Sequence, residues 1–241
     1  MRSHLLREKR PDAERHRPQG GPAPGLLVRS LAAGLLVGPT VSLLFACLLW
    51  EPNLRPVFRA VLGRSRVDVG LPITVVAVTV LAALAAGATF ARLVLAYRGQ
   101  RPGFRRPSVV AVAFLLASVA GVFLAGSLEP VGVALPDAQR LVVFRVAFVG
   151  ASALVALLST AIAGWTLGLR HALPRALAVT ALTAATYLAI AVAVDPLPGW
   201  HVGGGDRAML KVATVGNLIA GLVGGATAFA LLARAPQPGR R

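Results

Sequence analysis

Charged residues are scarce in this chain of 241 residues: they make up 14% of it, against about a quarter of a typical soluble domain. Acidic residues are the scarcest, with nine Asp and Glu against 25 Lys and Arg. Hydrophobic residues make up 56% and fall into several long runs. Runs of about 20 apolar residues match the thickness of a bilayer. The sequence therefore excludes a soluble globular domain and indicates an integral membrane protein.

Cysteine and the common catalytic motifs are almost absent. The single cysteine, Cys47, excludes an internal disulfide framework and a thiolate metal cluster, and we expect it to lie buried in the membrane. The sequence has no glycine-rich phosphate loop with a lysine and no H-E-x-x-H motif. The four histidines lie in separate segments and form no set with a nucleophile. We therefore expect a protein that is not an enzyme and binds no cofactor.

The net charge of +16 comes from arginines that lie mostly between the apolar runs. In a soluble protein this excess would indicate nucleic-acid binding. Between membrane spans, basic residues set the orientation and meet anionic lipid headgroups. We therefore predict membrane lipids, and no nucleic acid, as partners.

The pattern of apolar runs predicts an all-α fold, a polytopic membrane bundle of about six transmembrane helices. Residues 1–25 are charged and then rich in Pro and Gly, which predicts a disordered basic cytoplasmic tail. Residues 26–234 form the transmembrane domain, and 235–241 form a short basic tail. The predicted spans are about 28–50, 71–97, 108–126, 141–169, 175–194 and 208–233.

Two connections between the predicted spans have a definable character. Residues 51–70 are predicted to form a loop in which Leu54, Phe58 and Leu62 recur at helical spacing, which indicates a short helix on the membrane surface. The segment EPVGVALPDAQR, residues 129–140, is predicted to turn the chain.

Six spans place both ends of the transmembrane domain on one side of the membrane. With that side inside, the inner segments hold 15 Lys and Arg and the outer segments hold six. The excess predicts a multi-pass protein of the cytoplasmic membrane with both termini inside. Residues 51–70, an outer segment with four arginines, favour the opposite orientation.

Small residues recur along the last predicted span. Gly216, Ala220 and Gly224 lie four residues apart, and Gly221 and Gly225 form the adjoining stripe. Small residues at this spacing let helices approach closely in lipid. They indicate packing within the bundle or, alternatively, contact with a partner subunit or a moving helix. A similar pair, Gly164 and Gly168, lies in the fourth predicted span.

Three polar residues are predicted to lie at depth in the membrane. Arg145 is about a turn inside the outer end of its span, and Lys211 is placed similarly and can extend to the headgroups. Asn217 lies about two turns into the last span, where facing lipid would be costly. We predict that Asn217 bonds to a neighbouring helix or, alternatively, lines a polar pathway.

The stretch DPLPGWHVGGGDR, residues 195–207, joins the last two predicted spans on the outer side. Its Asp195, His201 and Asp206 are candidate ligands for a transported divalent cation such as cobalt, together with the outer acids Glu129 and Asp137. Alternatively, Asp195 ends one helix, Asp206 caps the next, and Gly and Pro supply the turn.

The order of these features resembles the CbtA-type cobalt transporter subunits, a multi-span membrane family. RSLAAGLLVG opens the first span and EP follows it, LPDAQR precedes the fourth span, and VDPLPG precedes the glycine-rich last span. The resemblance implies cobalt uptake together with a small single-span partner subunit; the small-residue faces also allow a homo-oligomer. We predict a transporter or permease subunit, with a non-transporting membrane scaffold or assembly subunit as the alternative.

Overall fold

The protein is described by a computed structural model, which covers the backbone of residues 24–62, 67–133, 137–194 and 205–235. Side chains are described within these ranges except at 24, 46–76, 126–138, 140–141, 194 and 205–212. The described residues form six α-helices and contain no strand, so the predicted fold class is confirmed. The helices are α1 (Pro24–Leu62), α2 (Val67–Tyr97), α3 (Arg105–Val133), α4 (Asp137–Thr166), α5 (Ala172–Val194) and α6 (Gly205–Ala233).

All six helices are long and apolar enough to cross a membrane. Each contains an apolar stretch of 21 to 25 residues. Large apolar side chains are also exposed on the outside, among them Leu35, Leu81 and Leu116, each more than 60% exposed. An apolar exterior of this kind fits lipid and not water. The protein is therefore an integral membrane protein with six candidate spans.

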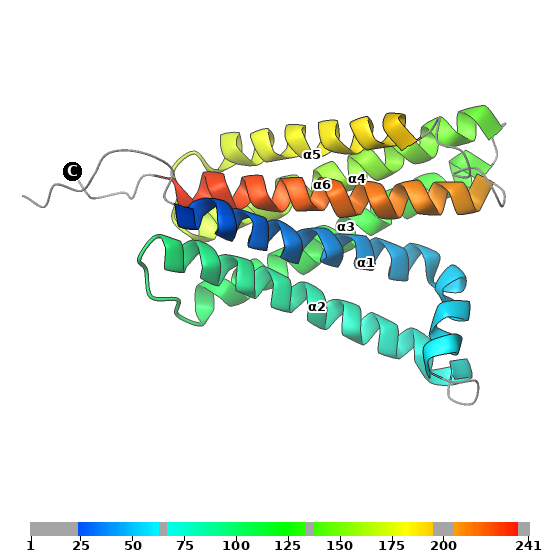
Figure 1. Ribbon diagram of the computed structural model, residues 1–241, viewed down its shortest axis with the longest axis horizontal. Coiled ribbons are helices and arrows are strands. Elements are labelled where there is room, and N and C mark those ends of the chain that lie inside the picture. The colour runs from blue at the N-terminus through cyan, green and yellow to red at the C-terminus, as the bar shows by residue number, and fades with distance from the viewer. Residues whose placement is uncertain (1–23, 63–66, 134–136, 195–204, 236–241) are drawn as a thin grey trace, which may run out of the picture.

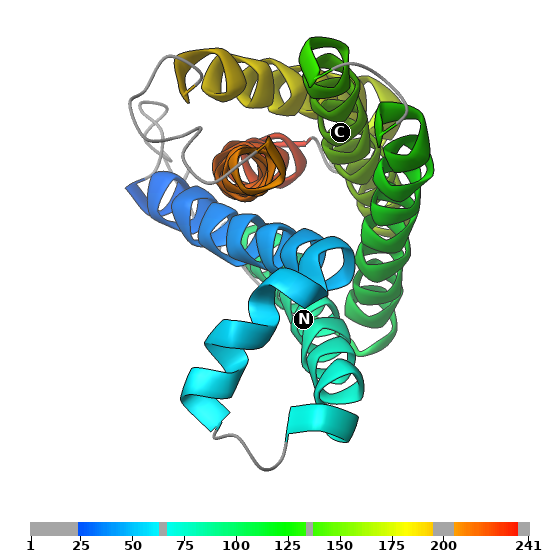
Figure 2. The ribbon, with the colours of Figure 1, turned by 90° about the vertical axis from the view of Figure 1, so that its right-hand side faces the viewer.

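Helix α6 occupies the inside of the bundle. The helices run side by side along the long axis (Figure 1), and the end view shows α6 enclosed by α1, α4 and α5 (Figure 2). Its most extensive contacts are with α1, followed by α5 and α4. Of the six apolar stretches, that of α6 is the most buried. The start of α1 and the end of α6 lie at the same end of the bundle, together with the α2–α3 and α4–α5 links.

Two glycines close the helices at this shared end. Gly99 and Gly168 have φ of +67° and +69°, a left-handed conformation that costs other residues free energy. After α2, the Gln100 N–H donates to the Leu95 carbonyl at 2.9 Å, and after α4 the Leu169 N–H donates to the Gly164 carbonyl at the same distance. This pattern satisfies carbonyls that a helix end leaves without partners. Gly168 is thus a capping residue and lies outside α4, which corrects its predicted role in helix packing.

The predicted loop over residues 51–70 is wrong, because most of it is helical. Residues 51–62 continue α1, and α2 already begins at Val67. Figures 1 and 2 show that this last part of α1, drawn in cyan, bends away from the bundle. Pro52 and Pro56 each lack an N–H donor, which accounts for a bend. The helical spacing predicted for Leu54–Leu62 is therefore present, but as a bent extension of the first span.

The predicted turn over residues 129–140 is also too long. Helix α3 continues to Val133, and α4 begins at Asp137. A helix satisfies its backbone groups internally, so it can continue past the hydrocarbon layer without a free-energy cost. Hydropathy marks where the apolar stretch ends and does not mark where the helix ends.

Candidate functional site

A cavity of about 50 Å³ lies inside the bundle, with residues from all six helices in its wall. Its size exceeds the roughly 10–15 Å³ that one water-sized molecule needs. Helix α6 contributes six residues to this wall, and five of them are glycine or alanine. The α6 residues in the wall are Asn217, Ala220, Gly221, Gly224, Gly225 and Ala228.

The small residues of α6 form two stripes that face different helices. A Cβ atom on Gly221 would lie 2.8 Å from the Gly38 Cα of α1, and one on Gly225 would meet Val37 of α1 at the same distance. On the other stripe, a Cβ on Gly216 would lie 2.7 Å from the ring of Tyr187 in α5. These distances are shorter than real Cβ contacts, so the helices approach where glycine alone fits. The α6 stripes pack within the bundle.

One side of the cavity is polar. Ser152, Ser159 and Thr160 of α4, Thr183 of α5 and Asn217 of α6 contribute polar side chains to its wall. Valine, phenylalanine, alanine and glycine make up the rest. Among the side chains that the structure describes, no charged one lines this cavity.

Asn217 is the centre of the polar side. Its side chain is 1% exposed, and the Ser152 hydroxyl donates a hydrogen bond of 2.6 Å to its Oδ1 atom. This bond joins α6 to α4. The amide nitrogen Nδ2 has no hydrogen-bond partner among the described residues. A buried donor without a partner costs about 1–3 kcal/mol, so a ligand that accepts a hydrogen bond from Nδ2 would gain that free energy.

The other hydroxyl groups can accept hydrogen bonds. The Ser159 hydroxyl donates its proton to the Val155 carbonyl at 2.5 Å, and the Thr183 hydroxyl donates to the Val179 carbonyl at 2.8 Å. Each oxygen keeps lone pairs for a further bond. The wall therefore combines an amide donor with hydroxyl acceptors, an arrangement that suits a small uncharged solute able to donate and accept.

The structure describes the surroundings of two of the three polar residues that were predicted to lie at depth in the membrane. Asn217 bonds to α4 and lines the cavity, so it combines the two alternatives that its position allowed. Arg145 is partly buried in α4, two turns before Ser152, and does not line the cavity. Lys211 is part of α6, but its side chain lies outside the described residues.

The predicted metal ligands lie outside the part of the chain that the structure describes. Asp195 and His201 belong to the segment 195–204, which is not described. Asp206 is the second residue of α6, and its side chain is not described, nor are those of Glu129 and Asp137. Among the described side chains, no three His, Cys, Asp or Glu residues come together. The outer metal site stays a prediction.

The sequence did not single out the hydroxyl residues of the cavity. Ser152 and Ser159 are seven residues apart, and two turns of helix place such residues on the same face. The spacing alone could have indicated a polar face on α4. It could not indicate that Thr183 and Asn217 meet this face, because that depends on how the helices pack. Tyr187 was also missed; its ring is buried, and its hydroxyl has no partner among the described residues.

Comparisons with protein-family models, curated proteins and solved structures found no match to the chain. The resemblance to the CbtA-type subunits therefore rests on the sequence segments that carry it. What it implies about cobalt and a partner subunit stays a prediction.

Proposed function

We propose that the protein is a transporter or permease subunit, and that a small uncharged polar solute passes through the central cavity. The observation that carries the proposal is the amide nitrogen of Asn217, which lies in the cavity wall and has no hydrogen-bond partner among the described residues. A buried polar group normally has a hydrogen-bond partner. A solute with a carbonyl or hydroxyl oxygen supplies one as it passes, which lowers its free energy in the middle of the membrane.

The described residues of the cavity wall carry no charge, which favours an uncharged solute. Moving a bare cation into an apolar interior is very costly unless paired charges surround it. The polar side chains that the described part of the wall offers are one amide and four hydroxyl groups. Groups of this kind stabilise an uncharged solute that forms two or three hydrogen bonds, and they discriminate against ions.

The glycine contacts of α6 supply a route for movement. Gly221 contacts the backbone of Gly38 in α1, and contacts between small residues let helices slide past one another more easily than contacts between large ones. On the opposite stripe, Gly216 faces the Tyr187 ring and Gly224 faces the Thr183 side chain of α5. A shift of α6 would open the cavity first toward one end of the bundle and then toward the other.

We place the protein in the cytoplasmic membrane, with the end that carries the α2–α3 and α4–α5 links facing the cytoplasm. Residues 98–107 and 170–175 of these links contain six arginines and no acid. Basic residues concentrate on the cytoplasmic side of membrane proteins. Uptake therefore runs from the end of the bundle where α5 ends and α6 begins.

A competing proposal is that the transported species is a divalent cation such as cobalt, bound outside the cavity. It rests on the resemblance stated above and on Asp195, His201 and Asp206. The triple variant Asp195→Ala/His201→Ala/Asp206→Ala then lowers cellular cobalt accumulation, measured by mass spectrometry of washed cells. Accumulation equal to that of the wild type removes these residues as a metal site and leaves the uncharged solute as the proposal.

A non-transporting scaffold is the competing function. Such a protein would present its small-residue faces to partners. In the described structure the α6 stripes contact α1 and α5, so they are already used within the bundle. A stable stoichiometric partner in crosslinked native membranes, with no solute phenotype on deletion, would favour the scaffold.

Transport of uncharged solutes is tested with the purified chain in liposomes. Urea and glycerol are suitable probes, because both donate and accept hydrogen bonds and carry no charge. After rapid mixing with a hyperosmotic solution, light scattering reports solute entry. We expect faster entry of at least one probe than in protein-free liposomes, and no entry of cobalt through the cavity alone. Equal rates with and without protein for both probes contradict the proposal.

A further inference from the structure

Tyr187 of α5 is a buried polar residue that lies outside the wall of the central cavity. Its side chain is 1% exposed, and its hydroxyl has no hydrogen-bond partner among the described residues. A buried tyrosine hydroxyl usually has a partner, so one without a partner calls for an explanation. A ligand that hydrogen-bonds to this hydroxyl would supply the missing partner.

Thr183 shows where Tyr187 lies relative to the cavity. Thr183 lines the cavity wall, and Tyr187 follows it by four residues, so both lie on the same face of α5. Helix α5 begins at Ala172, at the end of the bundle that carries the α2–α3 and α4–α5 links, and runs toward the opposite end (Figure 1). Tyr187 therefore lies one turn beyond Thr183, on the side from which the proposed uptake runs.

The ring of Tyr187 lies against the backbone of α6 at Gly216. A Cβ atom on Gly216 would be 2.7 Å from the ring carbon Cζ, which carries the hydroxyl, and 2.8 Å from Cε2. Glycine is therefore the residue that leaves room for the ring. Gly216 directly precedes Asn217, whose Nδ2 atom also has no partner among the described residues. The hydroxyl end of Tyr187 is thus held against the turn of α6 that carries the amide of the cavity wall.

The core cluster that contains Tyr187 is otherwise apolar. It includes Phe45, Phe144 and Phe148, and the ring centroids of Phe45 and Phe148 are 6.3 Å apart. A polar solute that enters from this end loses its hydration among such side chains, which costs free energy unless hydrogen bonds replace it. The Tyr187 hydroxyl can donate one hydrogen bond and accept another. It can therefore replace part of the lost hydration before the solute reaches Asn217.

We propose that the Tyr187 hydroxyl is a second binding site for the solute, between the outer end of the bundle and the central cavity, and that it selects solutes with a hydrogen-bonding oxygen. The inference rests on the proposed function. The ring covers Gly216 in the described structure, so a shift of α6 moves the helix backbone away from the hydroxyl and makes room for the solute. The solute then passes from Tyr187 on α5 to Asn217 on α6.

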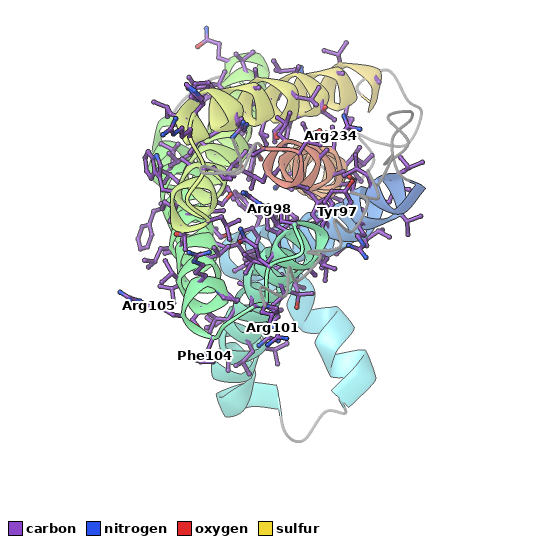
Figure 3. All side chains as sticks on the ribbon, turned by 90° about the vertical axis from the view of Figure 1, so that its left-hand side faces the viewer. Tyr97, Arg98, Arg101, Phe104, Arg105 and Arg234 are labelled. Atoms are coloured by element: carbon purple, nitrogen blue, oxygen red, sulfur yellow. The ribbon has the colours of Figure 1, made fainter. Side chains whose placement is uncertain are left out.

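Tyr187→Phe tests the site, because it removes one oxygen atom and keeps the ring against Gly216. The other tyrosine of the chain supplies the matched control, Tyr97→Phe: Tyr97 ends α2 at the opposite end of the bundle and does not line the cavity (Figure 3). Light scattering after hyperosmotic mixing reports urea and glycerol entry into liposomes of equal protein content. We expect Tyr187→Phe to lower entry about three- to tenfold, and Tyr97→Phe to keep the wild-type rate.

Thermal unfolding in detergent separates this role from a structural one. Because the hydroxyl has no partner among the described residues, its removal should leave the midpoint temperature of Tyr187→Phe unchanged or slightly raised. A midpoint several degrees below that of the wild type would show that the hydroxyl bonds within the protein, which overturns the proposal. An equal loss of solute entry in Tyr97→Phe would also overturn it, since the effect would then not belong to this position.

Asn217→Leu, measured in the same assay, distinguishes failure of this inference from failure of the proposed function. If Asn217→Leu slows entry and Tyr187→Phe does not, the solute uses the cavity and the Tyr187 site is wrong. If the wild type admits neither probe faster than protein-free liposomes, the proposed function is wrong and the site is excluded with it. Slower entry through both variants, with an unchanged midpoint temperature for Tyr187→Phe, supports the site.

Discussion

At the scale of single residues, Asn217 supplies the amide group of the cavity wall. Its oxygen accepts the proton of Ser152, and its nitrogen has no partner among the described residues. A buried amide within a span is costly next to lipid, but a cavity can provide it with polar neighbours. Asn217 therefore has two roles: its oxygen joins α6 to α4, and its nitrogen adds a hydrogen-bond donor to the cavity wall.

The bond between Ser152 and Asn217 should contribute measurably to stability. We expect a double-mutant cycle of Ser152→Ala and Asn217→Ala to give a coupling free energy of about 0.6 kcal/mol, and at most about 1.7 kcal/mol. The value is small because each side chain finds other partners when the helices separate in the membrane. The coupling free energy is obtained from the free energies of unfolding of the four proteins in micelles, measured by trapping the separated helices.

The same cycle between Ser159 and Asn217 is the matched control. Ser159 bonds to the Val155 carbonyl of its own helix, so its coupling to Asn217 should lie near zero. A coupling as large as that of Ser152 would show that the hydrogen bond between α4 and α6 is not the source.

Residues differ in how far the sequence predicts their role. Asn217 was identified because an amide inside the membrane needs a polar neighbour, whichever way the helices pack. Ser152 was not identified, because a serine in a membrane helix can bond to its own backbone and then needs no neighbour. Ser159 and Thr183 do this, while Ser152 bonds across to α6.

At the scale of elements, α6 packs chiefly against α1, α5 and α4. Its two glycine stripes differ in their neighbours, with α1 on one side and α5 on the other. The Ser42 hydroxyl of α1 also donates a hydrogen bond of 3.0 Å to the Thr214 carbonyl of α6. In lipid, close approach of this kind replaces the hydrophobic effect as the source of helix association.

A methyl group on Gly221 should separate α1 from α6. We expect Gly221→Ala to lower the free energy of unfolding by about 1–3 kcal/mol, because the new Cβ would lie 2.8 Å from the Gly38 backbone, which cannot move aside alone. Thermal unfolding in detergent reports the change as a lower midpoint temperature.

Gly150→Ala in α4 provides the matched control. A Cβ there would have only the Leu124 side chain nearby, at 3.9 Å. This variant should be neutral or slightly stabilising, since alanine favours the helix over glycine. If both variants unfold at the wild-type temperature, the close contact of α1 and α6 is not what holds α6 in place.

The sequence predicted which segments are helices better than it predicted where they end. The apolar stretches determine the number of helices, because only a helix satisfies a lone backbone segment in lipid. The ends depend on local features: Gly99 and Gly168 close two helices, whereas Pro52 and Pro130 do not interrupt theirs. Proline predicts a break in water more strongly than at a membrane surface, where a bend is tolerated.

At the scale of the whole molecule, the end of the bundle with the α2–α3 and α4–α5 links is rich in arginine. We expect a reporter fused at Gly103, in the α2–α3 link, to be active in the cytoplasm, and one fused at Trp200 to be active outside. The physical reason is the retention of arginine-rich links on the cytoplasmic side. Paired fusions to alkaline phosphatase and green fluorescent protein measure this. A cytoplasmic signal at Trp200 would reverse the direction of uptake proposed here.

Hydropathy and charge were sufficient to predict a six-helix membrane protein. The free energy of transferring a segment from water to lipid depends on these two properties, so they show which segments lie in the membrane. They did not predict the cavity. Its wall joins residues as far apart as Val37 and Ala228, and its volume depends on how six helices leave space around α6. The outer stretch of Asp195, His201 and Asp206 stood out because its residue types are rare in this chain, yet the interior cavity has the uncharged chemistry that the proposed function uses.

The most direct test of the account is the solute permeability of Asn217→Leu. Leucine keeps the branching and the number of heavy atoms of the side chain and removes the amide, so a solute loses its hydrogen-bond donor in the cavity wall. In liposomes of equal protein content, we predict that urea or glycerol entry through the variant falls about five- to tenfold below the wild type. Entry through Gly150→Ala should remain unchanged. Wild-type entry rates through a folded Asn217→Leu variant would contradict the claim that the cavity is the path of the solute.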